Sequence, residues 1–311
     1  MPHLGEILSI VCALLWATAV MFFRVSMRRA VEPFALNIFK NLVALVCLLL
    51  TLPFISGVFE GIGLQELLVL SVSGILGITM ADTLFLSALH RLGASRNAIL
   101  DCLYSPFVIV LSVIALGERI LPWQGVGFAM VLVGVLVTVF DPVVKTQQLP
   151  DGSLETVMDD DVATRRNRLL GMGQGALSMF LMALGIVLAK PVLETTSTVG
   201  AATIRIAVSL VAAVVWLGLK GRLRTCANGF TRELPYGTMA IGGFLGTYLA
   251  LIVWMAGYKY TTASTAAVLN QTSVFFIIFM AGYVLKESIS ARRVVGAIIG
   301  FAGVAVIFLT G

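Results

Sequence analysis

Apolar residues gather into ten long runs along the chain, and short polar segments separate nearly all of them. About 20 apolar residues cross the hydrocarbon core of a bilayer as a helix. A membrane-spanning β-strand needs about half that length and alternates in polarity, which these runs do not. The sequence therefore predicts an all-α integral membrane protein with ten transmembrane helices, at roughly 4–23, 34–56, 66–89, 97–117, 122–140, 169–189, 200–219, 236–257, 264–285 and 292–309.

One connection, residues 142–168, is much longer and more polar than the others. It carries two prolines, three consecutive acids at Asp159–Asp161, and a group of arginines that ends at Arg168. We interpret it as a linker between a first repeat, residues 1–141, and a second repeat, residues 169–311, with five predicted helices each. An odd number of spans per half predicts that the second half is inverted in the membrane relative to the first.

The two halves repeat one sequence pattern. The stretch from Ala94 to Thr138 resembles the stretch from Ala263 to Ile307, and a constant shift of 169 positions aligns them. The shift pairs Asp101 with Asn270, Glu118 with Glu287, Gly127 with Gly296, Gly134 with Gly303 and, further upstream, Gly74 with Gly243. We therefore expect the functional site to lie where the two copies face each other.

Composition agrees with this pattern, since 59% of the residues are hydrophobic, only 12% are charged and the mean hydropathy is +1.01. A soluble domain is about half apolar and about a quarter charged. The net charge of +5 comes mostly from Lys and Arg in the loops, and we interpret it as a determinant of topology and not of nucleic-acid binding.

The basic residues divide unequally between the two predicted faces of the membrane. One face receives Arg24, Arg28, Arg29, Arg91, Arg96, Lys145, Arg165, Arg166, Arg168, Lys220, Arg222, Arg224, Arg232, Lys286, Arg292 and Arg293. The other face receives Arg119, Lys190 and Lys259. Because cytoplasmic loops are enriched in Lys and Arg, the first face is predicted to be cytoplasmic, with both termini on the outer side of the cell membrane.

The sequence gives little support for a metal site or a redox site. Two histidines and four cysteines without a CxxC pair form no recognisable zinc or redox motif, so we expect no metal and no cofactor. The chain also lacks the GxxxxGK[ST] motif of P-loop proteins, so ATP is not expected to be the direct energy source.

Glycines occur at helix-packing spacings. Gly242 and Gly246 form one GxxxG motif, and Gly296 and Gly300 form another. Such motifs let helix backbones approach closely, either within one chain or across a dimer. We favour packing within the chain and leave a monomer or a homodimer open.

The doubled pattern also resembles a known family. It combines Pro106 in the fourth predicted helix, the sequence Gly117-Glu118-Arg119 at the end of that helix, and Gly127 and Gly134 in the fifth. These features resemble the EamA family of the drug/metabolite transporter superfamily. The resemblance implies a secondary transporter for a small metabolite, such as an amino acid, working by alternating access and mostly in the direction of efflux. It also implies that Glu118 and Glu287 are structural and fix the turn into the next helix.

The chain departs from the family pattern in its second copy, where Phe275 replaces the proline and Lys286-Glu287-Ser288 replaces Gly-Glu-Arg. Its N-terminus and second loop also lack the basic residues that many relatives carry there. The predicted orientation is therefore opposite to that of much of the family.

Ionisable residues inside a membrane helix are costly and are candidate site residues by default. Lys40, Asp82 and Asp101 each lie roughly 6–10 Å inside the predicted cytoplasmic boundary, at about 1.5 Å per residue. Lys40 can neutralise one carboxylate and leave the other to exchange a proton, so a proton is a candidate coupling ion. The alternatives are that Lys40 extends to the interface and that Asp101 complements a helix dipole. Asp82 is harder to explain as architecture, because its repeat mate is Leu251.

Further polar residues are candidates for a solute pathway between the repeats. Asn270 and Gln271 lie in the ninth helix, and Tyr104 lies close to Asp101 in the fourth. Arg205, the repeat mate of Lys40, can attract an anionic group or stabilise a closed outer gate. Tyr248 is a candidate lining residue, although packing against lipid or protein is an alternative for it.

Two other functions stay open at this stage. The acids at Asp159–Asp161 are the one feature that suggests a membrane-embedded enzyme acting on lipid or prenyl phosphates, but such chemistry usually needs a second acidic cluster near a cavity. A scaffold without transport activity is the other alternative. A transporter whose partners are the lipid bilayer and a small-molecule solute explains more of the chain than either.

Overall fold

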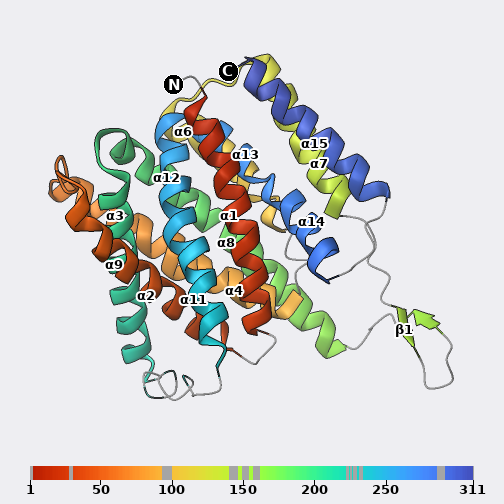
Figure 1. Ribbon diagram of the computed structural model, residues 1–311, viewed down its shortest axis with the longest axis horizontal. Helices are drawn as coiled ribbons and strands as arrows, with labels where there is room; N and C mark the ends of the chain where they lie inside the picture. Colours follow the sequence, from red (N-terminus) through yellow and green to blue (C-terminus); the bar gives the residue numbers. More distant parts are fainter. Residues whose placement is uncertain are drawn as a thin grey trace.

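The computed structural model describes residues 3–27, 31–92, 100–139, 146–148, 154–156, 162–221, 224, 226, 230, 234–285 and 291–310. The helices of the first half are α1 (Leu4–Met27), α2 (Pro33–Thr51), η1 (Leu52–Phe54), α3 (Leu64–Gly74), η2 (Ile75–Met80), α4 (Ala81–Leu92), α6 (Tyr104–Leu116) and α7 (Pro122–Val139). Those of the second half are α8 (Val162–Thr195), α9 (Thr198–Leu219), α11 (Tyr236–Gly243), η3 (Phe244–Leu249), α12 (Ala250–Tyr260), α13 (Ala263–Asn270), α14 (Ser273–Leu285) and α15 (Ala291–Thr310). They form one helical bundle in which α1 begins and α15 ends at the same end (Figure 1).

Within the described ranges, six helical segments are long and apolar enough to cross a membrane, and three further apolar helices are shorter. Large apolar side chains such as Ile114 and Leu309 are 77% and 86% exposed, as expected where the surrounding solvent is lipid. The prediction of a helical, multi-pass membrane protein is therefore confirmed.

The segment between the halves contains a short hairpin, in which β1 (Thr146–Gln148) pairs antiparallel with β2 (Leu154–Thr156). α8 then begins at Val162, earlier than the predicted start near 169, and it ends at Thr195 instead of near 189. A helix can continue past the hydrocarbon core into water, so the apolar run alone underestimates its length. The acids Asp159–Asp161 lie outside the described residues.

The backbone repeats its irregularities along with its sequence. η2 and η3 are π-helical turns, and the shift of 169 residues superimposes Ile75–Met80 on Phe244–Leu249. The same shift relates two interruptions of helix, at residues 102–103 and at residues 271–272. π-helical turns inside α-helices are rare and concentrate at functional sites. Both kinds of irregularity therefore mark corresponding places in the two halves.

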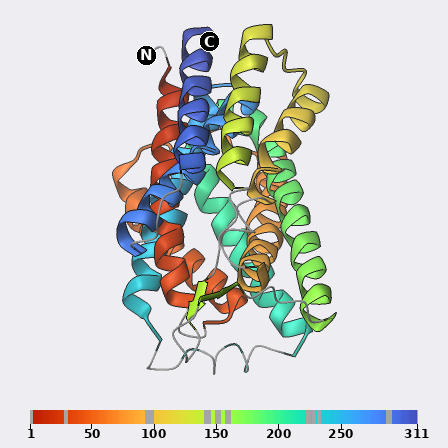
Figure 2. The same cartoon turned by 90° about the vertical axis from the view of Figure 1, so that its right-hand side faces the viewer.

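The helices of each half pack mainly on helices of the other half. α1 packs on α12 and α14. In the same way α8, which corresponds to α1, packs on α4 and α6, which correspond to α12 and α14. α3 packs on α9, just as α11 packs on α2. Figures 1 and 2 show these segments interleaved across the centre of the bundle. The space between the halves is therefore enclosed by equivalent elements of both.

Helices α7 and α15 form a closely packed pair at the edge of the bundle (Figure 1). A β-carbon on Gly134 would lie 2.5 Å from the carbonyl oxygen of Gly296, and one on Gly127 would lie 3.0 Å from that of Gly303. Because the contacts run in opposite residue order, these repeat-related helices are antiparallel. The glycines thus pack within the chain, as do Gly242 and Gly246, which contact α1.

Two of the three basic residues predicted on the outer face serve as helix caps. The ammonium group of Lys190 donates to the carbonyl oxygens of Tyr258 at 2.9 Å and Thr261 at 3.0 Å, where α12 ends. Lys259 donates to the carbonyl oxygen of Thr196 at 2.6 Å, just after α8 ends. A cation at a helix C-terminus meets free carbonyl groups and the negative end of the helix dipole. A local structural requirement thus explains two exceptions to the predicted charge bias.

Replacing Gly134 by alanine should destabilise the protein, because its β-carbon would collide with the backbone of α15. Overpacking of this kind costs about 1–3 kcal/mol. Gly173→Ala is the matched control, since no atom of the described residues lies within 4 Å of the position of its β-carbon in α8. Thermal unfolding in detergent should show a lower midpoint for Gly134→Ala and an equal or higher one for Gly173→Ala. Equal midpoints for the two variants would contradict the close packing of α7 and α15.

Candidate functional site

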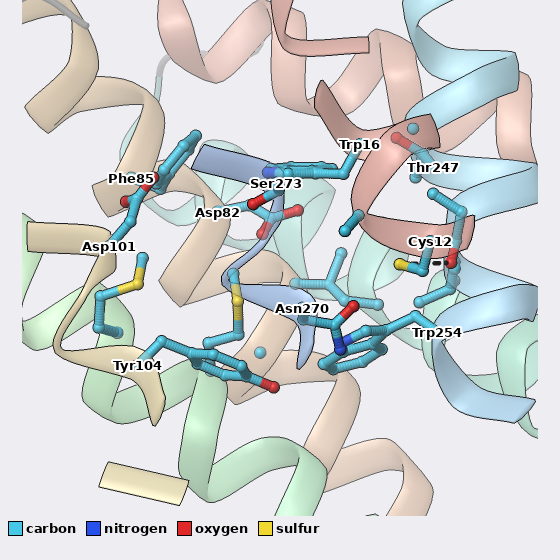
Figure 3. Close-up of a pocket in the computed structure, with 18 of the residues that line it drawn as sticks. Cys12, Trp16, Asp82, Phe85, Asp101, Tyr104, Thr247, Trp254, Asn270 and Ser273 are labelled. Carbon is cyan, nitrogen blue, oxygen red and sulfur yellow. Dashed lines mark hydrogen bonds between the residues drawn. The ribbon is translucent and has the colours of Figure 1, made fainter. Parts of the chain in front are cut away.

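A cavity of about 150 Å³ lies between the two halves. A cavity of about this volume in an apolar core accommodates a molecule the size of benzene. Both repeats line it, and Figure 3 shows Asp82, Asn270 and Trp254 around the same space. The polar, aromatic and sulfur-bearing residues that line it are Cys12, Trp16, Lys40, Asp82, Phe85, Asp101, Tyr104, Met179, Met182, Arg205, Thr247, Trp254, Asn270, Gln271 and Ser273.

The irregular backbone segments meet at this cavity. Gly77 and Ile78 line it from η2, and Gly246 and Thr247 line it from η3. Asp101 and Gln271 line it at the two interruptions of helix. At membrane depth, departures from helical structure are tolerated where protein or a cavity surrounds them. The repeated backbone irregularities of the two halves thus line one cavity.

Lys40 and Asp82 form a buried ion pair in the wall of the cavity. Lys40 Nζ lies 2.5 Å from Asp82 Oδ2, and the two side chains are 3% and 14% exposed. Pro33 begins α2 two turns before Lys40, and Asp82 follows η2 directly. Lys40 therefore points inward in this structure and does not extend to the interface. The ion pair joins two of the three charges that the sequence places at similar depth.

Amide side chains extend this ion pair into a network that the sequence analysis missed. Lys40 Nζ also donates to Asn41 Oδ1 at 3.3 Å, and Asn41 Nδ2 donates to Asn37 Oδ1 at 2.9 Å. Asn37 Nδ2 donates in turn to Thr83 Oγ1 at 3.0 Å. The signal in the sequence was the spacing of Asn37 and Asn41, one helical turn apart in an apolar span beside Lys40. The network satisfies the polar groups of α2 and joins them to α4.

Arg205 lies on α9 at the wall of the same cavity, and the residue is only 1% exposed. Its guanidinium carbon lies 5.5 Å from the centre of the Trp254 ring, a cation–π contact. Its Nε and Nη1 have no hydrogen-bond partner among the described residues. Within the same ranges it forms no ion pair with a carboxylate, since the two ion pairs found join Lys40 to Asp82 and Lys190 to Glu194.

Two further polar side chains at the cavity lack partners in the described part of the chain. They are Asn270, whose Oδ1 and Nδ2 are both unpaired, and Thr247, whose Oγ1 is unpaired. Most buried polar groups in proteins are hydrogen-bonded, so unpaired ones need an explanation. Their position at one cavity with Arg205 indicates a place where another molecule supplies the partners.

The other predicted site residues occupy different positions. Gln271 Nε2 donates to the backbone carbonyl oxygen of Asp101 at 2.8 Å, which joins the two interruptions of helix across the halves. Tyr104 lines the cavity, and its hydroxyl lies 2.5 Å from that of Tyr258. Tyr248 is not among the lining residues; its hydroxyl lies 2.6 Å from Thr51 Oγ1.

Glu118 differs from the expectation that it fixes the turn into the following helix. Its carboxylate accepts hydrogen bonds from the backbone N–H groups of Ala263 at 2.6 Å and Ser264 at 3.1 Å. The hydroxyl of Ser264 also donates to it, at 2.7 Å. Glu118 therefore caps the N-terminus of α13 in the other half, where a carboxylate satisfies free N–H groups and complements the helix dipole. Its repeat mate Glu287 lies outside the described residues.

Comparison with known proteins agrees with this duplicated architecture. The EamA-like transporter family matches residues 3–140 and again residues 169–309. The chain belongs to the EamA-like transporter family. This family is part of the drug/metabolite transporter superfamily, and the resemblance inferred from the sequence is confirmed.

Two individual matches of this EamA-like chain add to the comparison. An "Uncharacterized transporter" from Clostridium kluyveri (strain ATCC 8527 / DSM 555 / NBRC 12016 / NCIMB 10680 / K1) is 38% identical over 72 residues, which is 23% of this chain and 23% of that protein. A solved crystal structure of a protein covers 99% of this chain and 98% of its own, with a TM-score of 0.73 and 16% identity. The second match shows likeness of fold alone.

Breaking the Lys40–Asp82 pair on one side should cost more stability than removing both charges. Removing one partner of a buried ion pair typically costs about 3–5 kcal/mol, because the other charge is left uncompensated. Lys40→Met and Asp82→Leu should therefore each lower the unfolding midpoint in detergent, and the double variant should recover most of the loss. A double variant that loses the sum of both single effects would show that the two side chains are not coupled.

Proposed function

We propose that this protein is a secondary active transporter that moves a small metabolite, an amino acid or a related solute, across the cell membrane by alternating access. The observation that carries this proposal is the central cavity. Equivalent elements of both repeats enclose it, and polar groups that have no partner among the described residues line it. Transporters with inverted repeats bind their solutes at such interfaces between repeats. Outward transport is the direction that the family resemblance implies.

Ten membrane spans in two inverted halves fit the described helices. In the first half, α3 continues through η2 into α4, and in the second half, α11 continues through η3 into α12. Each of these continuous segments counts as one span. α13 and α14 are counted as one span with an interruption, and α6 with the residues before it as another. The antiparallel packing of the repeat mates α7 and α15 supports the inversion. Inverted halves can exchange conformations, and such an exchange would open the cavity to one side and then the other.

Proton coupling is part of the proposal and depends on the acids at the cavity. Lys40 neutralises Asp82 directly, whereas Asp101 lies at the interruption before α6. Protonation of either carboxylate changes the charge at the cavity by one unit, and protonation of Asp82 also weakens its pairing with Lys40. If binding of the solute depends on the charge of these carboxylates, binding of a proton there changes binding of the solute. Transport of the two would then be coupled.

Transport by the purified protein in proteoliposomes tests the function and the coupling. Radiolabelled metabolites should accumulate saturably when a proton gradient is imposed, and an ionophore should abolish the accumulation. Asp82→Asn or Asp101→Asn should remove the response to the gradient, because an amide cannot exchange the proton. If both variants respond to pH and ionophore as the unmodified protein does, neither acid couples transport to protons. If a broad panel gives no saturable uptake in either orientation of the protein, the transporter function is wrong.

The orientation of the termini is a separate proposal that rests on the distribution of basic residues. In a variant with its four native cysteines replaced, a single cysteine at position 2 should react with a membrane-impermeant thiol reagent added to intact cells. A cysteine at position 224, in a loop predicted to be cytoplasmic, should react only after the membrane is permeabilised. The opposite pattern would show that the chain is inserted in the other orientation.

A further inference from the structure

Lys40 and Arg205 occupy the same position in the two repeats. Each is the eighth residue of its helix, in α2 and α9, and the two are 165 positions apart in the chain. A glycine of the opposite half packs against the backbone of each. A β-carbon on Gly74 would lie 2.6 Å from the carbonyl oxygen of Arg205, and one on Gly243 would lie 3.2 Å from Cα of Lys40. The two cations are thus held at equivalent places at one cavity.

Their electrostatic partners are not equivalent. Lys40 is paired with Asp82, but the repeat mate of Asp82 is Leu251, which also lines the cavity. The second half therefore has an aliphatic side chain at the position that provides the counter-charge in the first half. Neither acid that lines the cavity replaces it, because Asp82 pairs with Lys40 and, in the described part of the chain, Asp101 forms no ion pair with Arg205.

Arg205 is consequently a buried cation with unmet hydrogen-bonding capacity. Its Nε and Nη1 have no partner in the described ranges, and the contact with Trp254 holds the guanidinium group close to the ring without satisfying those donors. Leaving a buried donor unpaired costs free energy, more so for a charged group. The planar guanidinium group matches a carboxylate, which can accept two parallel hydrogen bonds from it.

We propose that the solute of this cavity carries a carboxylate and that Arg205 binds it, in the place of the acid that the second repeat lacks. Asn270 and Thr247 provide further hydrogen-bonding atoms for the same solute. The inference rests on the proposed transport function and narrows its substrate to small carboxylate-bearing molecules. Amino acids and simple carboxylic acids share this chemistry. Amino acids also carry an ammonium group, which the carboxylates of Asp82 and Asp101 can attract.

Ligand-dependent thermal stability of the purified full-length protein tests the inference. The probes are the twenty amino acids and a set of short mono- and dicarboxylic acids, each compared with its primary amide. At least one acid should raise the unfolding midpoint, and its amide should not, because the amide lacks the charge that Arg205 requires. Stabilisation by amino acids alone would identify zwitterions as the solute, and stabilisation by simple acids would show that the carboxylate suffices.

Two substitutions connect the effect to Arg205. Arg205→Gln should weaken binding of the stabilising acid on the order of tenfold or more, because the charged donor is lost. Leu251→Asp should abolish binding, since an internal carboxylate would pair with Arg205 as Asp82 pairs with Lys40. Leu251→Asn, of nearly the same shape but uncharged, should weaken binding far less. Leu251→Asp keeps the test informative if Arg205→Gln fails to fold.

The inference is wrong if no acid in the panel stabilises the protein, if the amides stabilise it equally, or if Leu251→Asp binds the acid as well as Leu251→Asn does. Transport assays separate this failure from that of the proposed function. If the protein transports a neutral or cationic solute saturably and Leu251→Asp leaves this transport intact, the transporter function stands and the role given to Arg205 is wrong. Absence of both transport and binding would remove both.

Discussion

The bilayer imposes one constraint on which the rest of this structure depends, namely that a polar group inside it must find its partner within the protein. Lys40 meets that constraint through Asp82 and the amides of α2, and Gln271 meets it through the backbone of Asp101. Even the termini of the helices find partners, since Glu118 caps α13 of the other half and Lys190 caps α12 of its own half. Against this background, Arg205, Thr247 and Asn270 differ, because each has side-chain atoms without a partner among the described residues, and all three line one cavity.

Duplication accounts for where that cavity forms. Each repeat contributes a π-helical turn and an interrupted helix at corresponding positions, and the crossed packing of the halves brings all four irregular segments together. Glycines make this approach possible, because Gly74 and Gly243 place the helices of one half against the basic residues of the other. The same elements that hold the halves together therefore line the cavity, so a change of conformation in one half must alter it.

The asymmetry on which the proposed function depends lies in the few positions where the copies differ. Lys40 and Arg205 keep the positive charge in both halves, whereas Asp82 and Leu251 do not keep the negative one. Symmetric architecture allows the two halves to exchange roles, but a solute must be bound by particular atoms. In the proposed function the difference between the halves provides those atoms. Asp82 neutralises Lys40, whereas Arg205 has no carboxylate partner among the described residues.

The sequence by itself determined the helical membrane class, the duplication and the charged candidates, because these depend on local hydrophobicity and on spacing along the chain. It also placed Lys40 and Asp82 at one depth in the membrane. Only the tertiary structure decided which of them pair, that Asn37 and Asn41 join them, that Tyr248 lies away from the cavity, and that Glu118 caps a helix of the opposite half. The physical reason is that hydropathy records how deep a residue lies, whereas the packing and rotation of the helices determine which side chains meet.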